Sequence, residues 1–454
     1  MYDYAYRQMP TSTVVWIKVW VTIALLLLYY LTNPYVVSAQ LDEDFPRLEI
    51  PSSFNPVGSG ARALGMGGAF IAIADDATAA SWNPGGLIQL ETPEVSLVGA
   101  YTDRSEDLDF GTNPEASGSE GITTKNVNYL SAAYPFTWLG RNMIVSVNYQ
   151  HLFDFYRDWD FSLFNQSPGI SVEQDVSHTS EGSLSAIGMA AAIQVTPRIS
   201  LGMTLNFWQD GLYQNQWETE DINKWSDPSV PTTLKTIDYT RYEFSGFNYN
   251  LGMLWTITHN VTIGAVYKAP FTADIDRHEE TFEFVDDMGA PSDYFEVDKD
   301  QELDMPMSYG IGLSYRFSDS LSAALDIYRT EWDDFIYTDE DGNETSAISF
   351  KPADESDIEP TTQIRFGVEY LIIMDRSVIP LRGGCFYDPA PAEGSPDHYH
   401  GISLGSGIAT GNIVIDLAYQ YRFGNGVYDY MNENLDFSAD VKEHIMYASI
   451  IYHF

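Results

Sequence analysis

Apolar and polar residues alternate with a period of two from Glu94 to the last residue, Phe454. Residues 412–423 show the pattern most clearly, because every second side chain is Ile, Leu, Tyr or Phe, while Asp416 and Arg422 stand between them. This period is that of a β-strand whose two faces meet different surroundings. A soluble β-sandwich alternates in the same way, so the alternation by itself leaves sandwich and membrane barrel open.

The pattern divides this part of the chain into 14 strand segments. They lie near residues 94–104, 126–136, 142–155, 183–196, 198–212, 241–258, 261–275, 303–317, 320–334, 361–374, 377–387, 398–409, 412–423 and 443–454. Short turns, such as Ser318-Asp319 and Gly411, alternate with long loops. The long loops lie near residues 105–125, 156–182, 213–240, 276–302, 335–360, 388–397 and 424–442. Short turns at one rim, long loops at the other and an even strand count are typical of an outer-membrane barrel.

We therefore predict an all-β fold, a transmembrane antiparallel β-barrel of about 14 strands over residues 93–454. In a bilayer the sheet must close, since an open edge would leave backbone groups without hydrogen bonds in hydrocarbon. The aromatic C-terminus and the 30 Tyr and 10 Trp residues suit the aromatic girdles of such barrels. Residues 40–454 contain no uncharged apolar run of 18 residues, which excludes transmembrane helices there.

The first 39 residues have the features of an export signal. Arg7 and Lys18 flank the apolar run Val19–Leu31, and Val37-Ser38-Ala39 is a small-residue cleavage site. We predict a signal peptide over residues 1–39, with an uncleaved anchor as the alternative. Export of a strand-rich chain predicts localisation in the bacterial outer membrane.

Residues 40–92 are predicted to form an N-terminal extension followed by a hatch. Of residues 58–86, 17 are Gly, Ala or Ser, so the backbone can pass close to other structure. Trp82-Asn83-Pro84 ends this run with a turn. A segment of such small residues cannot build a core of its own, and we expect it to lie in the barrel lumen as a plug.

Charge and motifs exclude several classes of function. The net charge of −42, from 23 basic and 65 acidic residues, repels phosphate backbones and argues against nucleic acid as a partner. Cys385 is the single cysteine, so no internal disulfide can form. The dinucleotide-like string at 58–63 and the nucleophile-elbow string at 401–405 both lack the strand–turn–helix context that each motif needs. We therefore expect no enzyme activity and no cofactor.

The segment GARALGMGGAFIAIADDATAASWNP, followed by a barrel, resembles the FadL/TodX family of outer-membrane transporters for long-chain fatty acids and hydrocarbons. Tyr267-Lys268 is similar to the family's Tyr-Arg element, and residues 381–391 and 415–423 are similar to its late strands. The resemblance implies a hatch-gated barrel of 14 strands that carries hydrophobic small molecules or lipids by passive diffusion. PorV-like outer-membrane barrels, which bind secreted proteins in a secretion system, look similar around the Gly-rich segment and are the alternative.

The resemblance also implies roles for single residues. Asn83, Pro84 and Gly85 match the family's Asn-Pro-Ala hatch motif, with Gly in place of Ala, and are expected to hold or gate the hatch. Lys268 matches the Tyr-Arg element and is the first candidate to meet an acidic head group. Alternation also places further cations in the lumen: Arg316, Arg365, Arg382 and Arg422. Their alternative role is to brace the barrel by pairing with lumenal carboxylates, namely Asp326, Glu369 and Asp416.

Aromatic side chains are frequent in and before the long loops, where a hydrophobic molecule could leave water. The candidates for this hydrophobic capture are Phe155, Trp159, Phe161, Trp208 and Trp217. The alternative is that they form an interfacial girdle and pack the loops. We do not assign any one of them to a ligand.

Two stretches, residues 276–302 and 339–344, are densely acidic. The second lacks the ligand spacing of a complete calcium loop, so we assign no metal site. We expect solvated turns, with divalent cations that bridge these acidic loops to anionic outer-membrane lipid as the alternative.

Overall fold

The computed structural model describes residues 58–167, 170–209, 215–227, 230–285, 290–427 and 436–454. The predicted signal peptide, residues 1–39, and the extension up to residue 57 lie outside this part of the chain. Among the described residues, no helix combines the length and the apolar composition needed to cross a bilayer.

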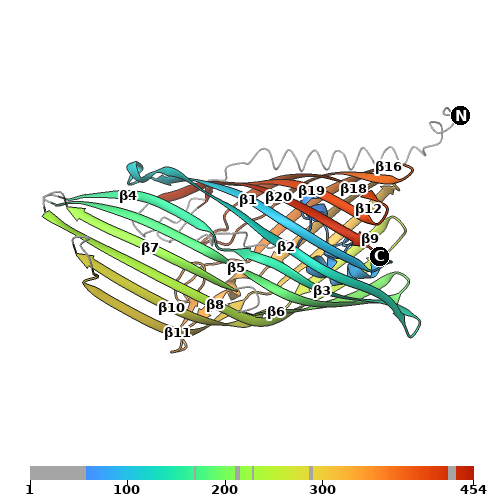
Figure 1. Ribbon diagram of the computed structural model, residues 1–454, viewed down its shortest axis with the longest axis horizontal. Helices are drawn as coiled ribbons and strands as arrows, with labels where there is room; N and C mark the ends of the chain where they lie inside the picture. Colours follow the sequence, from blue (N-terminus) through green and yellow to red (C-terminus); the bar gives the residue numbers. More distant parts are fainter. Residues whose placement is uncertain (1–57, 168–169, 210–214, 228–229, 286–289, 428–435) are drawn as a thin grey trace. The chain divides into compact units, whose positions relative to one another are not determined.

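Fourteen strands form one closed antiparallel barrel, as predicted (Figure 1). In order around the ring they are β1 (Glu94–Phe110), β2 (Gly118–Trp138), β3 (Arg141–Asp154), β5 (Ile170–Thr196), β6 (Ile199–Trp208), β8 (Val230–Thr256), β9 (Val261–Lys268), β12 (Ser308–Ser318), β13 (Leu321–Thr330), β16 (Thr361–Ile373), β17 (Ser377–Tyr387), β18 (Tyr399–Thr410), β19 (Ile413–Val427) and β20 (Phe437–His453). The last strand closes on the first, since Glu94 pairs with His453 and Phe110 with Phe437. Closure gives both edges of the sheet a partner.

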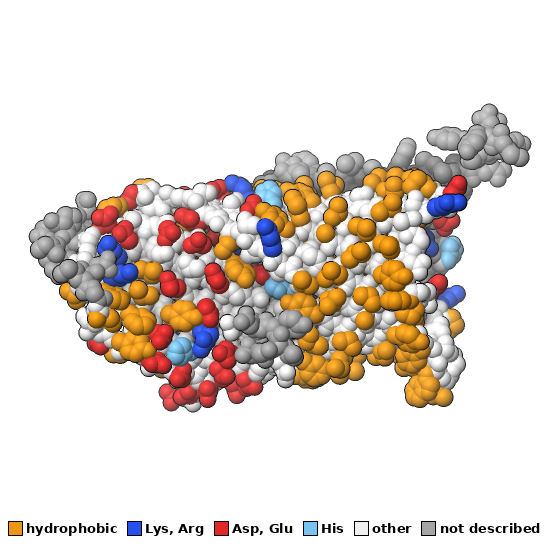
Figure 2. Space-filling model, viewed as in Figure 1, with side chains coloured by type: hydrophobic (Ala, Val, Ile, Leu, Met, Phe, Trp, Pro, Cys, Tyr) orange, Lys and Arg blue, Asp and Glu red, His pale blue; other side chains and the backbone are white. Residues whose placement is uncertain are grey.

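The wall has an apolar outer face at the end with the short turns. In β12, Tyr309, Ile311 and Leu313 point outward and are exposed, while Gly312 points inward and is buried. Figure 2 shows hydrophobic side chains over the half of the barrel that carries the C-terminus, and acidic side chains over the other half. This division places the bilayer around the half with the short turns and the acidic half outside the cell.

The predicted long loops at 156–182, 213–240 and 276–302 are wrong as loops, because each one forms a β-hairpin. The added strands are β4 (Arg157–Ser167), β7 (Gln216–Asp227), β10 (Phe271–Val285), β11 (Asp293–Met305), β14 (Ile336–Thr338) and β15 (Glu344–Ser346). They pair with one another and with the outer parts of β5 and β8, so they extend the wall beyond the apolar half. These strands contain aromatic and β-branched residues, which favour β-structure.

The segment predicted as one strand over 303–317 is two strands. Pro306 lies between β11 and β12 and has no N–H for a strand ladder. Before it, β11 pairs with β10 and β14, and after it, β12 pairs with β9 and β13.

Residues 58–90 lie inside the barrel, against the inner face of the wall (Figure 1). They include the helices α2 (Ala61–Gly65) and α3 (Ala79–Trp82) and the 3-10 helix η1 (Pro84–Gln89), and most of their side chains are buried. Two further 3-10 turns, η2 (Pro114–Ala116) and η3 (Trp332–Asp334), lie beyond the membrane half. We call residues 58–90 the lumenal segment. It contacts the wall closely, since a Cβ added at Gly264 of β9 would lie 2.2 Å from the carbonyl oxygen of Ile71.

Candidate functional site

An outer cavity with about 1630 Å³ of empty space lies within the extended part of the wall. Aromatic rings form much of its lining, and Trp217 stacks between Phe155 and Tyr242 with ring centroids 4.8 and 4.7 Å away. Arg157 and Arg277 also line the cavity. An apolar surface with a few cationic groups suits an amphipathic anion better than an inorganic ion.

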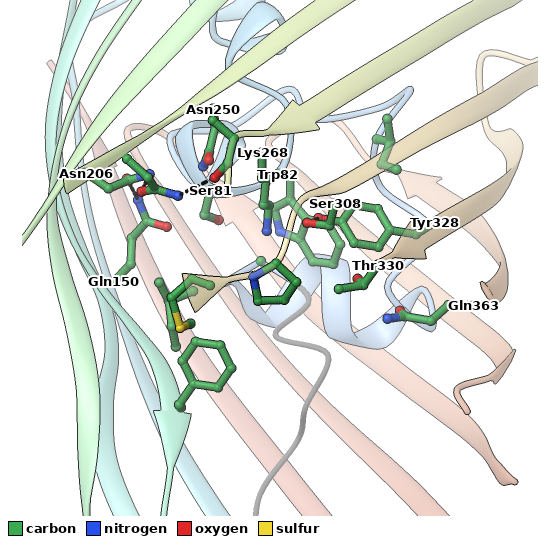
Figure 3. Close-up of a pocket in the computed structure, with 18 of the residues that line it drawn as sticks. Ser81, Trp82, Gln150, Asn206, Asn250, Lys268, Ser308, Tyr328, Thr330 and Gln363 are labelled. Atoms are coloured by element: carbon green, nitrogen blue, oxygen red, sulfur yellow. Dashed lines mark hydrogen bonds between the residues drawn. The ribbon is translucent and has the colours of Figure 1, made fainter. Parts of the chain in front are cut away.

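An inner cavity, with about 970 Å³ of empty space, adjoins the outer one (Figure 3). The two share the side chains of Phe153, Met305 and Trp332. The lumenal segment contributes Ser81 and Trp82 to the lining. The rest of the lining combines apolar side chains, such as Phe271 and Met305, with polar ones: Gln150, Asn206, Asn250, Lys268, Ser308, Tyr328, Thr330 and Gln363. Both cavities are therefore lined mainly by apolar surface, with hydrogen-bonding groups among the apolar side chains.

Lys268, the predicted head-group residue, is the last residue of β9 and lines the inner cavity. Its Nζ lies 5.6 Å from the centre of the Tyr328 ring, a cation–π contact. Among the described residues, no carboxylate oxygen lies within 4.0 Å of this nitrogen. An ammonium group without a neighbouring carboxylate is free to attract the acidic group of a ligand.

Arg382 braces the wall through ion pairs and is not available to a ligand. Its guanidinium contacts Glu369 and Asp416, both at 2.6 Å, and all three side chains are buried. Glu369 also accepts hydrogen bonds from Arg62 of the lumenal segment, at 2.9 and 3.0 Å. The ion pairs therefore connect the wall to the segment inside it.

Arg365 and Arg422 are also paired. Both contact the buried Asp388, at 3.3 and 3.2 Å, and Arg365 donates to the carbonyl oxygen of Gly67 at 3.2 Å. Arg316 differs from the prediction, because it is exposed at the short-turn end of β12 and does not line the cavities described above. It lies beside the turn, where the alternation no longer points a side chain into the lumen.

Asn83 connects two distant parts of the chain. Its Nδ2 donates to the carbonyl oxygen of Ile71 at 2.8 Å and to that of Met253, on β8, at 2.9 Å. Its Oδ1 accepts from the backbone N–H of Gly85 at 3.1 Å, which begins the η1 helix. One buried amide thus holds the turn of the lumenal segment and binds it to the wall.

Pro84 and Gly85 lie against the backbone of β6 and β8. A Cβ added at Gly202 of β6 would lie 2.2 Å from the carbonyl carbon of Pro84. A Cβ added at Gly85 would lie 2.9 Å from the carbonyl oxygen of Gly252. The glycine that replaces the alanine of the family motif therefore fits a contact in which a methyl group has little room.

A carboxylate on β13 binds the lumenal segment from another side. Asp326 Oδ2 accepts the backbone N–H groups of Phe70 and Ile71, at 2.6 and 2.8 Å. Asp326 is buried and lines the inner cavity. This attachment therefore lies at the inner cavity.

The predicted capture residues divide into two groups. Trp208 lines the inner cavity, and Phe155 and Trp217 line the outer one. Trp159 and Phe161 line neither, because they are buried in an aromatic core around Phe110 and Phe437. The capture role of all five stays a prediction.

Trp159 belongs to a buried ionic group outside the membrane half. Its Nε1 donates to Glu106 Oε2 at 2.5 Å, and Glu106 also contacts Arg104 and Arg157, at 2.5 and 3.3 Å. Burial alone would raise the pKa of Glu106, but the two guanidinium groups and the indole N–H lower it to about 2. Glu106 is therefore ionised at neutral pH.

Several cavity residues were not singled out from the sequence. They are the amides of β3, β6 and β8, together with Tyr242, Trp332 and Arg277. An inward polar residue in a barrel strand is ordinary, so no sequence signal marks these positions. Only the register of the strands brings them together.

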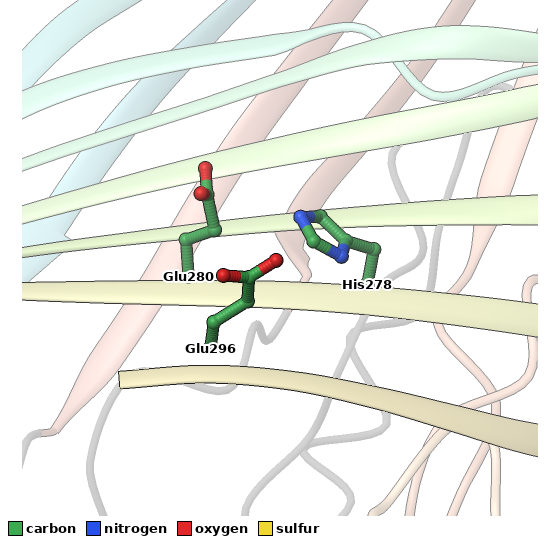
Figure 4. A group of neighbouring side chains, drawn as sticks. All are labelled: His278, Glu280 and Glu296. Carbon is green, nitrogen blue, oxygen red and sulfur yellow. The ribbon is translucent and has the colours of Figure 1, made fainter. Parts of the chain in front are cut away.

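A group of ligand-type side chains lies on the outward face of the β10–β11 hairpin (Figure 4). His278, Glu280 and Glu296 place one potential ligand atom each within 4.8 Å of one another. His278 Nδ1 contacts Asp298 at 2.7 Å, and this hydrogen bond raises the pKa of the imidazole. The divalent-cation alternative for residues 276–302 stays a prediction.

The string at 401–405 lies within β18, not at a strand-to-helix turn. The Ser403 hydroxyl donates to the carbonyl oxygen of Gly65 at 3.1 Å. It therefore binds the lumenal segment to the wall, and the nucleophile-elbow geometry is absent from this strand.

A closed antiparallel barrel with an apolar belt, short turns at one end and an extended acidic end defines a bacterial outer-membrane β-barrel protein. The chain belongs to the outer membrane protein transport family (OMPP1/FadL/TodX), which it matches over residues 55–454. No curated protein sequence matches the chain.

Solved structures of this fold resemble the chain at low sequence identity. A Pseudomonas aeruginosa FadL homologue has a TM-score of 0.62 and 15% identity, covering 90% of this chain and 100% of that chain. The Pseudomonas putida toluene transporter TodX has a TM-score of 0.57 and 14% identity, and the match covers 88% of this chain and 99% of that chain. The Ralstonia pickettii toluene transporter TbuX has a TM-score of 0.51 and 15% identity, and the match covers 88% of this chain and 100% of that chain. These likenesses concern the fold.

Proposed function

We propose that the chain carries hydrophobic molecules with an acidic group, such as long-chain fatty acids, across the outer membrane by passive diffusion. The observation that carries the proposal is the position of Lys268 in a cavity that adjoins an aromatic outer cavity. Transfer of each CH₂ group from water to such a surface contributes roughly 0.8 kcal/mol. The apolar tail would enter through the aromatic cavity, and the carboxylate would meet the ammonium group.

The lumenal segment would act as the hatch of this path, within the predicted hatch region of residues 40–92. Its Ser81 and Trp82 line the inner cavity, while Gln89 and Leu90 line a separate space at the short-turn end. The segment thus lies between the cavity that receives the molecule and the opposite end of the barrel. Passage would require it to shift, and Asn83, Pro84, Gly85 and Asp326 are the contacts that would resist the shift.

The family membership supports transport over the protein-binding alternative. The toluene transporters among the structural relatives carry an aromatic hydrocarbon. The lysine of the inner cavity favours an acid over such a hydrocarbon for this chain.

Uptake of labelled oleate by cells that lack their own fatty-acid transporter tests the proposal. Heat-modifiable gel mobility would first establish that the expressed barrel is folded. We expect uptake above the empty-vector control, and a loss of uptake when Lys268 is changed. Uptake equal to the control from a folded barrel would overturn the proposal.

A further inference from the structure

Amide side chains from three wall strands form a row along the inner cavity. Asn148 and Gln150 lie on β3, Asn206 on β6, and Asn248 and Asn250 on β8. Within β3 and β8 they stand two residues apart, so they share the inward face of the wall. All five side chains are buried. Such a row costs free energy unless each amide has a hydrogen-bond partner.

A glycine makes the row continuous across the intervening strand. Gly188 of β5 is in register with Asn148 on one side and Asn206 on the other. A Cβ at this position would lie 2.3 Å from Asn148 Oδ1, so any other residue would displace the amide. Gln150 Nε2 donates to Asn148 Oδ1 of the same strand at 2.7 Å. Because Gly188 has no side chain, Gln150 Nε2 also reaches across β5 and donates to Asn206 Oδ1 at 3.3 Å.

The row continues to β8 and ends there with an unused acceptor. Asn206 Nδ2 and Trp208 Nε1 donate to Asn248 Oδ1, at 3.0 and 3.2 Å. The next amide inward, that of Asn250, lines the cavity and is only 4% exposed. Its Oδ1 has no hydrogen-bond partner among the described residues. A hydroxyl group of a ligand could donate to it, whereas an alkyl chain could not.

The strand register places this amide next to the lysine. Lys268 is the partner of Asn250 on one side and of Ser308 on the other. The Cα atoms of paired residues on neighbouring strands are about 5 Å apart. A carboxylate at Lys268 and a hydroxyl at Asn250 would therefore both lie near the same end of the molecule.

We propose that the inner cavity selects acids that carry a hydroxyl group near the carboxylate, in preference to plain fatty acids. This inference rests on the proposed function, in which Lys268 meets the acidic group. A site built to hydrogen-bond a substrate hydroxyl rejects the analogue that lacks it, because the buried polar group of the protein then stays unpaired.

Binding of 3-hydroxymyristate and myristate to the purified full-length protein tests the proposal. Displacement of a fluorescent fatty acid in detergent gives both affinities, with detergent alone as the blank. We expect the hydroxy acid to bind about tenfold more tightly, the equivalent of one buried hydrogen bond. Equal affinities would overturn the proposal and leave the proposed transport of acids intact. If neither acid bound, both would be overturned.

Two variants test the assignment to Asn250. Asn250→Leu should bind both acids with equal affinity, because the acceptor for the hydroxyl group is lost. Asn126→Leu is the matched control, since that amide contacts His151 at 3.2 Å and does not line the cavity, and it should retain the preference. A preference retained in Asn250→Leu would contradict the assignment. If Asn250→Leu does not fold, Asn250→Ala makes the same comparison.

Discussion

The carboxylate of Asp326, on β13 of the wall, accepts the backbone N–H of Phe70 in the lumenal segment at 2.6 Å. The same oxygen accepts the N–H of Ile71 at 2.8 Å. One ionisable side chain therefore satisfies two consecutive donors of a segment that has little regular structure there. In the proposed hatch, Asp326 is one of the residues that bind the segment to the wall.

Asp326→Ala should loosen this part of the hatch without unfolding the barrel. A hydrogen bond contributes about 0.5–1.5 kcal/mol, so the loss of two should expose the local backbone to exchange. We expect faster amide hydrogen exchange in peptides covering residues 66–74, measured by mass spectrometry. Asp319→Ala, at an exposed short turn, is the control, and equal exchange in both variants would contradict the role of Asp326.

Gly85→Ala restores the family motif but should destabilise this chain. The added Cβ would lie 2.9 Å from the carbonyl oxygen of Gly252, and overpacking of this kind costs about 1–3 kcal/mol. The temperature at which the barrel loses its folded gel mobility should fall. Gly99→Ala is the comparison, because nothing lies within 4 Å of its added Cβ, and it should leave that temperature unchanged.

Lys268→Gln should weaken uptake of oleate about tenfold, since a charged hydrogen bond to the carboxylate is lost. Uptake of an uncharged hydrocarbon of similar length should change little, because the aromatic cavity is unaltered. Arg316→Gln removes a cation at the exposed end of β12 and should have no effect. A parallel loss for acid and hydrocarbon would mean that Lys268 supports the structure instead.

The ionic group around Glu106 predicts a response to acid. The folded pKa of Glu106, about 2, lies below the ordinary value of 4.5. The ionised carboxylate therefore stabilises the folded protein fully above pH 4.5, and this contribution is lost as the pH falls towards 2. The shift corresponds to about 3 kcal/mol. Fluorescence of Trp159, which donates to Glu106, should change as the pH falls through about 2, and should not change there in Glu106→Gln.

Other tryptophans also contribute to that fluorescence, so Trp159→Phe is the control. It should remove the transition near pH 2 while the remaining emission persists. The same transition in Glu106→Gln would assign the acid response to another carboxylate.

The sequence predicts the barrel well because each strand crossing repeats the same alternation. The outward Tyr309 and Ile311 and the inward Asp416 follow directly from it. The hairpins β4–β5, β7–β8 and β10–β11 were missed, since these stretches were assigned to the long loops that alternate with short turns in such barrels. There the pairing of neighbouring hairpins and the packing of aromatic rings decide the structure, and neither is visible in composition.

The candidate site was predictable only in part. Alternation indicates that Lys268 and Arg382 face inward, but it does not tell which of them has a carboxylate partner. The amide row depends on Gly188, which lets residues 148 and 206 meet across a third strand. Contacts between side chains on different strands follow from strand register, which a single sequence does not specify.

The central claim is that the lumenal segment closes a path through the barrel. Ion conductance of the purified protein in planar bilayers tests it most directly, with the full chain compared to a variant that lacks residues 58–87. Both must show the heat-modifiable mobility of a folded barrel. We expect the full chain to be nearly closed to ions and the deletion variant to open in large steps. Equal conductance of the two folded proteins would contradict the claim.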